Sequence, residues 1–320
     1  MRHFLAFVAL TVFFSGCTLT GSQGGDAVRN EEPAPAKAVV EQPTTTPADD
    51  GHFGDPTFEK EVVSAEPETP AITAPARDTD LTQGLDLKAK GELRAARMSL
   101  TLALSRKLPA ADEADALSAL DEINGKIFLS TGDDGDMQIY EVKSGDTLGA
   151  IGAKFKTTAE FIKRLNEMKK DTIFVGQRLH LPKGEFSLVV RKERFVMDLK
   201  LDGALIKRYR VGLGLNNSTP VGEFVVKNRI PEPADGSWPY GHEKHRLGSR
   251  WLGLKSDAGH RGYGIHGCPA SENGAIGGEC SQGCVRLTNE DVEEIYDIIP
   301  IGAKLTVVSD KSLVEKPTRR

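Results

Sequence analysis

The sequence predicts a multidomain chain whose C-terminal part is a mainly-β domain of the β-sandwich type, preceded by a small βααβ module and a helical hairpin. First, apolar and polar residues alternate from Phe186 onward, in runs separated by turn residues, as in strands with one buried face. Second, residues 137–183 follow a strand, helix, helix, strand pattern. Third, residues 81–131 repeat apolar positions at helical spacing. At 320 residues the chain is long enough for two or three domains.

Residues 1–17 have the features of an export signal. Arg2 precedes an apolar run at 4–14, which is shorter than the ~20 residues that span a bilayer, and small residues follow as at a cleavage site. The tetrad at 14–17 resembles the lipobox of bacterial lipoproteins, which implies that Cys17 is lipidated and anchors the chain in a membrane. The residue after that cysteine is Thr18 and not Asp, which in bacterial lipoproteins is typical of transport to the outer membrane. An ordinary signal peptide that contains a cysteine is the alternative.

Residues 18–80 have the composition of a solvated tether. They are rich in proline and acidic residues and poor in aromatic ones, so they bury too little apolar surface to fold. A flexible chain of this length spans ~45 Å, on an estimate of about 5 to 6 Å times the square root of its length. We expect the tether to carry the folded domains from a membrane to the cell wall, in the periplasm. A net charge of -5, without a dense Lys/Arg block, argues against a nucleic-acid partner.

The helical spacing in residues 81–131 predicts two or three short helices with a break at Pro109. The pattern resembles a single tetratricopeptide-type unit, and one such unit cannot stack into a solenoid. Two interpretations stay open: a helical hairpin packed on a neighbouring domain, and a peptide-binding groove. The apolar positions are Leu85, Ala89, Leu93, Ala96, Leu100 and Ala103 before the break, and Leu117, Leu120, Ile123 and Ile127 after it.

Residues 137–183 predict a compact module with strands at 139–142 and 177–181 and helices at 148–155 and 158–166. A capping box, Thr157 to Glu160, opens the second helix. Three segments closely resemble a LysM module, which implies binding to glycans that contain N-acetylglucosamine; a LysM fold used only as a spacer is the alternative. These segments are Val142–Leu148, Asn166 and Val175–Leu179.

Residues 186–310 predict the strand-rich domain, and 311–320 form a tail. An Asp202-Gly203 pair between two alternating runs is a strong hairpin signal. One helix is expected from Glu290 to Ile299, capped by Asn289 and stopped before Pro300. The remaining predicted strands lie at 222–226, 251–254, 263–266, 284–287 and 304–308.

The combination of Cys284 with His266, eighteen positions upstream, is typical of covalent acyl transfer. The thiolate is the attacking species, so a nearby imidazole has to take the thiol proton. A buried structural thiol is one alternative. A zinc site made with Cys268 and Cys280 is another, but H-x-C and C-x3-C spacings lack the paired C-x2-C of structural zinc sites. We therefore expect neither a metal nor another cofactor.

The segment Ser281–Leu287 closely resembles the active-site signature of the YkuD-type L,D-transpeptidases, with fourteen residues between His266 and Ser281 as that signature requires. Segments Ser218–Phe224 and Leu247–Leu254 look like framework motifs of the same family. One position departs, because Gln282 stands where the family usually has a second histidine. The resemblance implies that His266 is the base, that Gly267 fixes its tautomer, and that backbone N–H groups at Gln282, Gly283 and Cys284 hold the oxyanion.

The same resemblance implies a substrate, a peptidoglycan tetrapeptide stem cleaved between diaminopimelate and the terminal D-Ala. The acyl group then passes to an amine on another stem, giving a 3-3 crosslink, or to a lysine of a wall-anchored protein. Water as acceptor makes the same site a carboxypeptidase or amidase, and a catalytically weak peptidoglycan-binding lipoprotein is a further alternative. Arg286 and Arg250 are candidates for binding substrate carboxylates, and Tyr263 is a further candidate contact.

The remaining cysteines predict a disulfide between Cys268 and Cys280. An exported chain meets an oxidising environment, and with Cys17 lipidated and Cys284 the nucleophile these two are the pair left. Closing this short loop is worth ~3 kcal/mol in the chain-entropy model. Two unpaired thiols, or a Cys280–Cys284 redox pair, are the alternatives.

Overall fold

The computed structural model describes residues 77–133 and 135–309. The predicted export signal, the lipidation site Cys17, residues 18–76 of the predicted tether and the C-terminal tail lie outside the described residues. Within the described ranges no helix has the length and apolar character needed to cross a membrane.

Three helices form the first part of the described chain: α1 (Thr79–Ala89), α2 (Leu93–Ala103) and α3 (Ala110–Ile127). The side chain of Asp78 accepts hydrogen bonds from the first turn of α1, so this helix begins inside the predicted tether. Gly91, with a φ of 82°, sits in the turn that divides α1 from α2. Pro109 ends the break before α3, as its position in the sequence predicted.

The LysM-like module consists of β1 (Met137–Glu141), α4 (Leu148–Lys154), α5 (Ala159–Leu165) and β2 (Arg178–Pro182), with β1 and β2 antiparallel. The predicted βααβ order is confirmed. The predicted capping box is wrong by one residue, because Thr158 Oγ1 accepts the N–H of Phe161 at 2.9 Å whereas Thr157 Oγ1 is buried without a partner. Thr158 has the extended backbone that an N-cap requires.

The mainly-β domain contains one eight-stranded sheet with the order β11-β9-β8-β7-β12-β3-β4-β5. Most neighbours are antiparallel, but β12 is parallel to β3 and β11 is parallel to β9. Its strands are β3 (Phe186–Arg191), β4 (Val196–Leu201), β5 (Ala204–Arg210), β7 (Gly222–Pro231), β8 (Arg250–Lys255), β9 (Gly264–His266), β11 (Val285–Arg286) and β12 (Lys304–Val308). The predicted hairpin joins β4 and β5, where Asp202 and Gly203 both have positive φ, as a type I′ turn requires.

Shorter elements complete this domain. A parallel pair, β6 (Leu213–Gly214) and β10 (Glu279–Ser281), forms a separate small sheet. Three 3₁₀ turns connect strands: η2 (Lys192–Arg194), η3 (Leu215–Asn217) and η4 (Ala270–Ala275). Helix α6 (Asn289–Ile298) is capped by Thr288, whose Oγ1 accepts the N–H of Asp291, and not by Asn289 as predicted.

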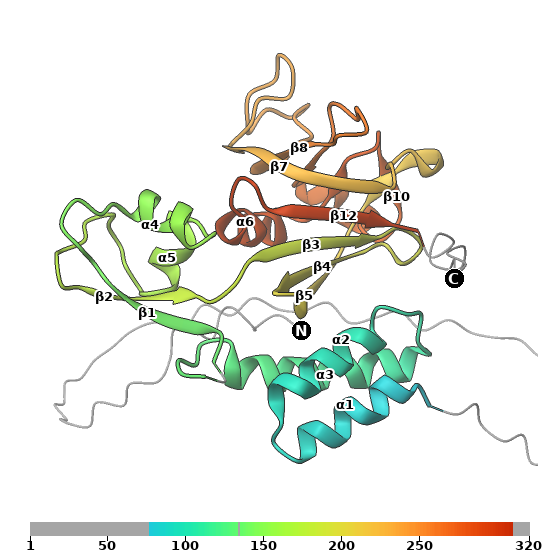
Figure 1. Ribbon diagram of the computed structural model, residues 1–320. Coiled ribbons are helices and arrows are strands. Elements are labelled where there is room, and N and C mark those ends of the chain that lie inside the picture. The colour runs from blue at the N-terminus through green and yellow to red at the C-terminus, as the bar shows by residue number, and fades with distance from the viewer. Residues whose placement is uncertain (1–76, 134, 310–320) are drawn as a thin grey trace, which may run out of the picture. The chain divides into compact units, whose positions relative to one another are not determined.

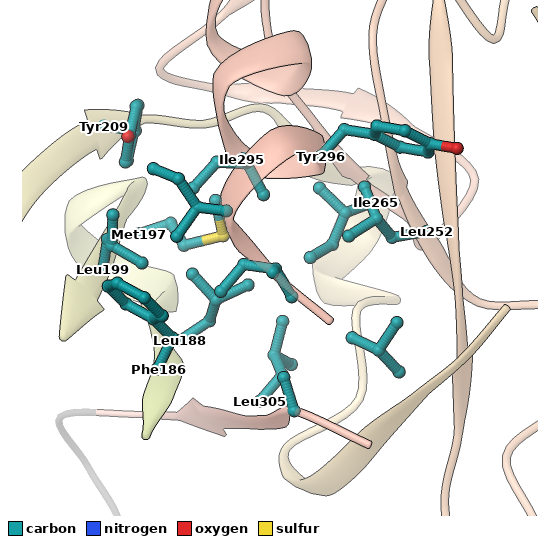
Figure 2. Close-up of a cluster of buried hydrophobic side chains, with 14 of the residues drawn as sticks. Phe186, Leu188, Met197, Leu199, Tyr209, Leu252, Ile265, Ile295, Tyr296 and Leu305 are labelled. Atoms are coloured by element: carbon teal, nitrogen blue, oxygen red, sulfur yellow. The ribbon is translucent and has the colours of Figure 1, made fainter. Parts of the chain in front are cut away.

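The core lies between the sheet and α6 (Figure 2). Strands from distant positions in the sheet order contribute to it, such as Tyr209 of β5 and Ile265 of β9, together with Ile295 of α6. Phe161 of α5 belongs to the same core: it is fully buried and its ring meets that of Phe186 edge-on at 5.5 Å. Phe161 therefore joins the LysM-like module to the core of the β domain. The module also has a separate apolar core of its own, made of Val142, Leu148, Ile151, Ile162, Leu179 and Leu181.

Helices α2 and α3 pack on β5, the edge strand of the large sheet, and α1 packs on these two helices (Figure 1). Asn124 of α3 donates to the carbonyls of Leu205 and Ile206, and Thr101 of α2 accepts the N–H of Leu205. These bonds occupy backbone groups that an edge strand otherwise leaves open. Of the two interpretations from the sequence, the structure favours the packed hairpin.

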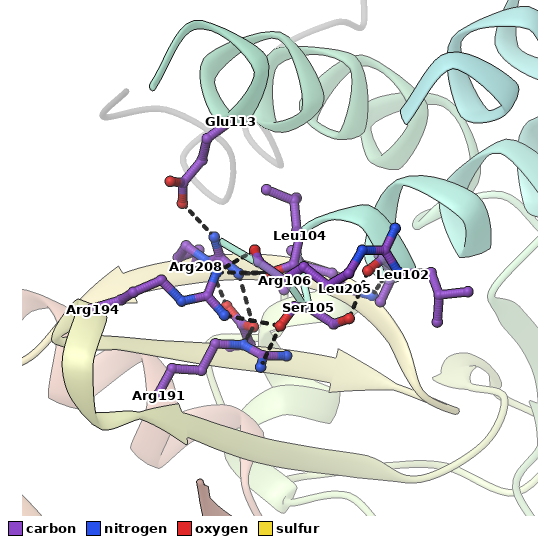
Figure 3. Close-up of polar contacts among 11 residues, drawn as sticks. Leu102, Leu104, Ser105, Arg106, Glu113, Arg191, Arg194, Leu205 and Arg208 are labelled. Carbon is purple, nitrogen blue, oxygen red and sulfur yellow. Dashed lines mark hydrogen bonds and ion pairs between the residues drawn. The ribbon is translucent and has the colours of Figure 1, made fainter. Parts of the chain in front are cut away.

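Arginines of the sheet bind the C-terminal end of α2 (Figure 3). Arg191 and Arg208 donate to the carbonyls of Ser105 and Leu104, at 2.9 and 3.0 Å, and both also pair with the buried carboxylate of Asp198. Cations are favourable here because the last carbonyls of a helix carry partial negative charge. The contact holds the helical unit on the sheet.

Candidate active site

His266 and Cys284 lie on adjacent parallel strands. Val285 pairs with Ile265 and Arg286 with His266, and the side chains of Ile265 and Val285 are both buried in the core. Successive side chains of a strand point to opposite faces. His266 and Cys284 therefore share the face away from the core, with Cys284 at the level of Gly264 on the neighbouring strand.

The imidazole of His266 is oriented by its backbone surroundings. Its Nδ1 lies 2.6 Å from the carbonyl oxygen of Gly267, and since a carbonyl only accepts, Nδ1 carries the proton and Nε2 keeps its lone pair. The ring stacks on Trp251 of β8 with centroids 5.8 Å apart. The structure thus places Gly267 where the resemblance required it, and His266 in the tautomer that a base needs.

Burial keeps His266 neutral. The side chain is almost fully buried, and burial lowers its pKa from 6.5 to about 4, with Arg286 acting in the same direction. Three groups raise the pKa of His266, but by less than burial lowers it. These are the carbonyls of Gly267 and Leu247 and the carboxylate of Asp235. At neutral pH the imidazole is therefore an unprotonated acceptor.

Cys284 is a half-buried thiol in the resting state. Burial raises its pKa, while the N–H of Gly264 and the charge of Arg286 act against this rise. Its Sγ is 3.8 Å from the carbonyl oxygen of Gly262 and also accepts the N–H of Gly264, and within the described residues no hydrogen bond joins it to His266. The pair is thus a neutral thiol and a neutral imidazole on one face.

The turn before Cys284 is fixed by Ser281. Its Oγ accepts the N–H of Gly283 at 3.0 Å and donates to the carbonyl of Cys284 at 2.7 Å. The predicted oxyanion role is therefore wrong for the N–H of Gly283, which is already bonded. The N–H groups of Gln282 and Cys284 have no acceptor in the part of the chain that the structure describes.

Gly283 is a glycine for two physical reasons. Its φ of 132° is one that other residues rarely adopt. A Cβ there would lie 2.7 Å from Cε1 of Tyr263, so the tyrosine ring covers this backbone. The structure therefore places Tyr263 at the turn before Cys284, and its predicted contact with substrate stays a prediction.

The two candidate arginines have different surroundings. Arg286 is buried beside His266 and bonds Glu272 at 2.6 Å, so one face of its guanidinium already holds a carboxylate. Arg250 lies over the ring of Tyr296 in α6, 5.4 Å from its centre. Neighbouring strand residues point to opposite faces, so Arg250 points away from the face of Trp251. Arg250 therefore lies on the other face of the sheet from His266, and its predicted contact with substrate stays a prediction.

The predicted disulfide is not formed. Cys268, Cys280 and Cys284 are free thiols. The buried Sγ of Cys268 donates to Asn273 at 3.3 Å, whereas Cys280 Sγ occupies the space beside Gly212, where a Cβ would lie 2.2 Å away. Both thiols also lie near Arg286 and Glu272, and Arg286 donates a hydrogen bond to Cys280. Within the described residues no group of three or more His, Cys, Asp or Glu side chains is placed to hold a metal ion.

Sequence reasoning missed three residues of this region. Trp251, which stacks on the base, was noticed only as part of a framework motif. Asn289 was interpreted as a helix cap, but its Oδ1 accepts the N–H of Ser249 and fills the space beside Gly267, where a Cβ would lie 2.2 Å away. Glu272, the partner of Arg286, carries no signal in spacing or composition.

Comparisons with known proteins identify the family of the two domains. Residues 185–308 match the family model of the YkuD L,D-transpeptidase catalytic domain, and residues 140–182 match that of the LysM domain. The chain is 31% identical over 180 residues to the putative L,D-transpeptidase YkuD of Bacillus subtilis, covering 53% of this chain and 99% of that protein. It is 31% identical over 138 residues to the putative L,D-transpeptidase YqjB of the same species, covering 42% of this chain and 77% of that protein. A solved L,D-transpeptidase from Mycobacterium tuberculosis H37Rv is 21% identical with a TM-score of 0.33, covering 42% of this chain and 63% of that one.

Proposed function

Because the chain belongs to the YkuD family of L,D-transpeptidases and carries a LysM domain, we propose that it transfers peptidoglycan stem peptides through a thioester on Cys284. The observation that carries the proposal is the placement of His266 and Cys284 on one face of adjacent strands, with Nδ1 of His266 bonded to Gly267. This leaves Nε2 as the acceptor for the thiol proton.

The first half-reaction forms the acyl-enzyme. His266 Nε2 takes the proton of Cys284, and the sulfur attacks the carbonyl between diaminopimelate and the terminal D-Ala. As the tetrahedral intermediate collapses, the amide bond breaks and D-Ala leaves with the proton from His266. The raised pKa of Cys284 and the lowered pKa of His266 favour a neutral thiol and a neutral imidazole in the free enzyme, so the proposal places the proton transfer in the substrate complex.

The N–H groups of Gln282 and Cys284 are the donors that the proposal assigns to the oxyanion. Both are free of acceptors within the described chain, and removal of one such donor typically costs about 3 kcal/mol of transition-state stabilisation. Both are backbone groups, so the proposal does not require a histidine side chain at position 282.

The second half-reaction transfers the acyl group to an amine. His266 removes a proton from the amine, the nitrogen attacks the thioester, and the thiol leaves with that proton. The proposed acceptor is the side-chain amine of a second stem, which gives a 3-3 crosslink. A lysine of a wall-anchored protein and water are the other acceptors that the same chemistry allows.

The proposal extends to location. The LysM domain would hold the glycan strand, and a lipid on Cys17 would anchor the chain in the outer membrane, on its periplasmic side. Cys17 lies outside the described residues, so this part rests on the sequence alone. Mass spectrometry of the membrane-extracted N-terminal peptide tests it, because lipidation adds acyl chains to a peptide that begins at Cys17.

The decisive experiment incubates the purified full chain with a disaccharide tetrapeptide and analyses protein and products by mass spectrometry. We expect a stem-peptide adduct on the peptide that contains Cys284, followed by crosslinked dimers. Cys284→Ser is the control, which should give neither. An unmodified Cys284 without products, in a chain that still sediments with cell-wall sacculi, would favour the non-catalytic peptidoglycan-binding protein.

A further inference from the structure

One carboxylate joins three segments around the candidate active site. Glu272 lies in η4, within the stretch that connects His266 to Cys284 along the chain. Its Oε2 is 2.6 Å from Nη1 of Arg286, and its Oε1 is 3.1 Å from Nη1 of Arg246. Both oxygens are thus used, each by a different arginine.

Arg286 is the partner that needs this carboxylate. Its side chain is 8% exposed, and Arg286 pairs in register with His266 across the parallel ladder. A buried guanidinium without a counter-charge is costly, and its field acts on every neighbouring titratable group. Glu272 is the one carboxylate that pairs with Arg286 in the described residues.

Arg246 connects the same carboxylate to the loop between β7 and β8, residues 232–249. The backbone N–H of Arg246 donates to Asp235 at 3.1 Å, so Asp235 is held in the same loop. Asp235 and Arg286 are the charged groups that act on His266, and the thiol of Cys284 lies on the same face. Glu272 therefore contacts both elements that carry these charges.

We propose that Glu272 is a positioning residue of the active site: its carboxylate neutralises Arg286 beside the base and anchors the loop 232–249 through Arg246. The inference rests on the proposed function, because it concerns the same thiol and imidazole. Glu272 contacts neither of them directly and acts through the two arginines.

The consequence of losing this charge differs for the two catalytic groups. An unneutralised Arg286 favours the thiolate, so it should lower the pKa of Cys284. The same charge disfavours imidazolium, so His266 should become a weaker base. Removal of the Glu272 charge should therefore make Cys284 more reactive toward an alkylating agent while slowing turnover.

The test compares Glu272→Gln with wild type in two assays on the full chain. Iodoacetamide alkylation of Cys284 at pH 8, measured by peptide mapping so that Cys268 and Cys280 are counted separately, should rise ~3-fold. The kcat on disaccharide tetrapeptide should fall ~10-fold, with KM changed by less than about twofold. The alkylation rate is followed against pH, because a lowered thiol pKa shifts the midpoint of the profile, whereas a loosened fold exposes Cys284 and raises the rate without shifting that midpoint.

Control variants separate charge from structure. Glu243→Gln removes the same charge from an exposed position of the loop 232–249, and both rates should match wild type. Glu272→Asp keeps the charge and should bring both rates back toward wild type. Arg246→Gln removes the contact with the loop 232–249 but leaves the Glu272–Arg286 pair in place. It should lower kcat without changing the alkylation rate of Cys284. This variant keeps the proposal testable if Glu272→Gln does not fold.

Unchanged alkylation and kcat within twofold in Glu272→Gln would overturn the proposal. The same holds if Glu243→Gln reproduces the Glu272→Gln effects. Absence of turnover in wild type would refute the proposed function instead, and the alkylation comparison would still decide the role of Glu272.

Discussion

Acidification should destabilise the folded chain through one identified residue, His266. Its pKa is about 4 in the folded protein and 6.5 in an unfolded chain. Above pH 6.5 the imidazole is neutral in both states, so it contributes no pH dependence. Between pH 6.5 and 4 the unfolded chain binds a proton that the folded chain does not, so the free energy of unfolding falls as the pH is lowered.

The magnitude follows from the two pKa values. Their difference, at about 1.4 kcal/mol per unit, gives a total loss of about 3 kcal/mol once the pH is below 4. About 2 kcal/mol of this is lost between pH 7 and pH 5. This is a large part of the 5 to 15 kcal/mol that is typical of folded domains. Exposed carboxylates titrate mainly below pH 5, and burial raises the pKa of Asp121 and Asp297, which act on stability with the opposite sign. The comparison with a His266 variant therefore isolates the contribution of the histidine.

The assay is urea unfolding followed by tryptophan fluorescence at pH 7, 6 and 5, in wild type and in His266→Gln. We expect wild type to lose about 2 kcal/mol more than the variant across this range. His180→Gln, which removes an exposed histidine of the LysM domain, is the matched control and should follow wild type. If His266→Gln loses stability as steeply as wild type, a different group titrates and the account of a buried neutral base is wrong.

Further predictions concern the nucleophile, the turn before it and the core. Cys284→Ser should lower turnover at least ~10³-fold, because oxygen is the weaker nucleophile at neutral pH, and wild-type rates in a product assay would refute the mechanism. Gln282→His should change kcat by less than about tenfold, and a hundredfold gain would mean that the side chain takes part. Phe161→Ala should cost about 3 to 5 kcal/mol in denaturant unfolding, because it removes a fully buried ring that packs on Phe186, and a loss below about 1 kcal/mol would contradict this packing. Thr158→Ala should cost about 1 kcal/mol in denaturant unfolding, whereas Thr157→Ala should be near neutral, and the reverse order would restore the predicted cap.

The contacts between the LysM domain and the β domain determine how the binding of the LysM domain to peptidoglycan has to be measured. Phe161 is buried with Phe186 and with Phe128 after α3, and Arg229 of β7 pairs with Glu160 of α5 at 3.4 Å. A fragment of residues 137–183 would expose this surface to water. Sedimentation with sacculi should therefore use the full chain, with substitutions confined to the exposed loops of the LysM domain.

The sequence by itself determined features that depend on neighbours along the chain. Strand and helix periods, the break at Pro109, the Asp202-Gly203 turn and the βααβ order are all local, because they follow from side-chain alternation and from backbone conformations that single residues allow. The candidate pair, His266 and Cys284, was found from spacing and flanking residues. These predictions required no knowledge of which strands meet.

Only the tertiary structure decided which side chains are partners. Arg250 was a candidate because a guanidinium group binds carboxylates, but the alternation of β8 turns it toward Tyr296, away from the base. Cys268 and Cys280 were paired by elimination, yet Asn273 and Gly212 are their neighbours. Glu272 could not be found in the sequence, because its two arginines come from separate segments. Contacts of this kind form when the fold brings distant segments together, and the pattern of one segment does not specify what faces it.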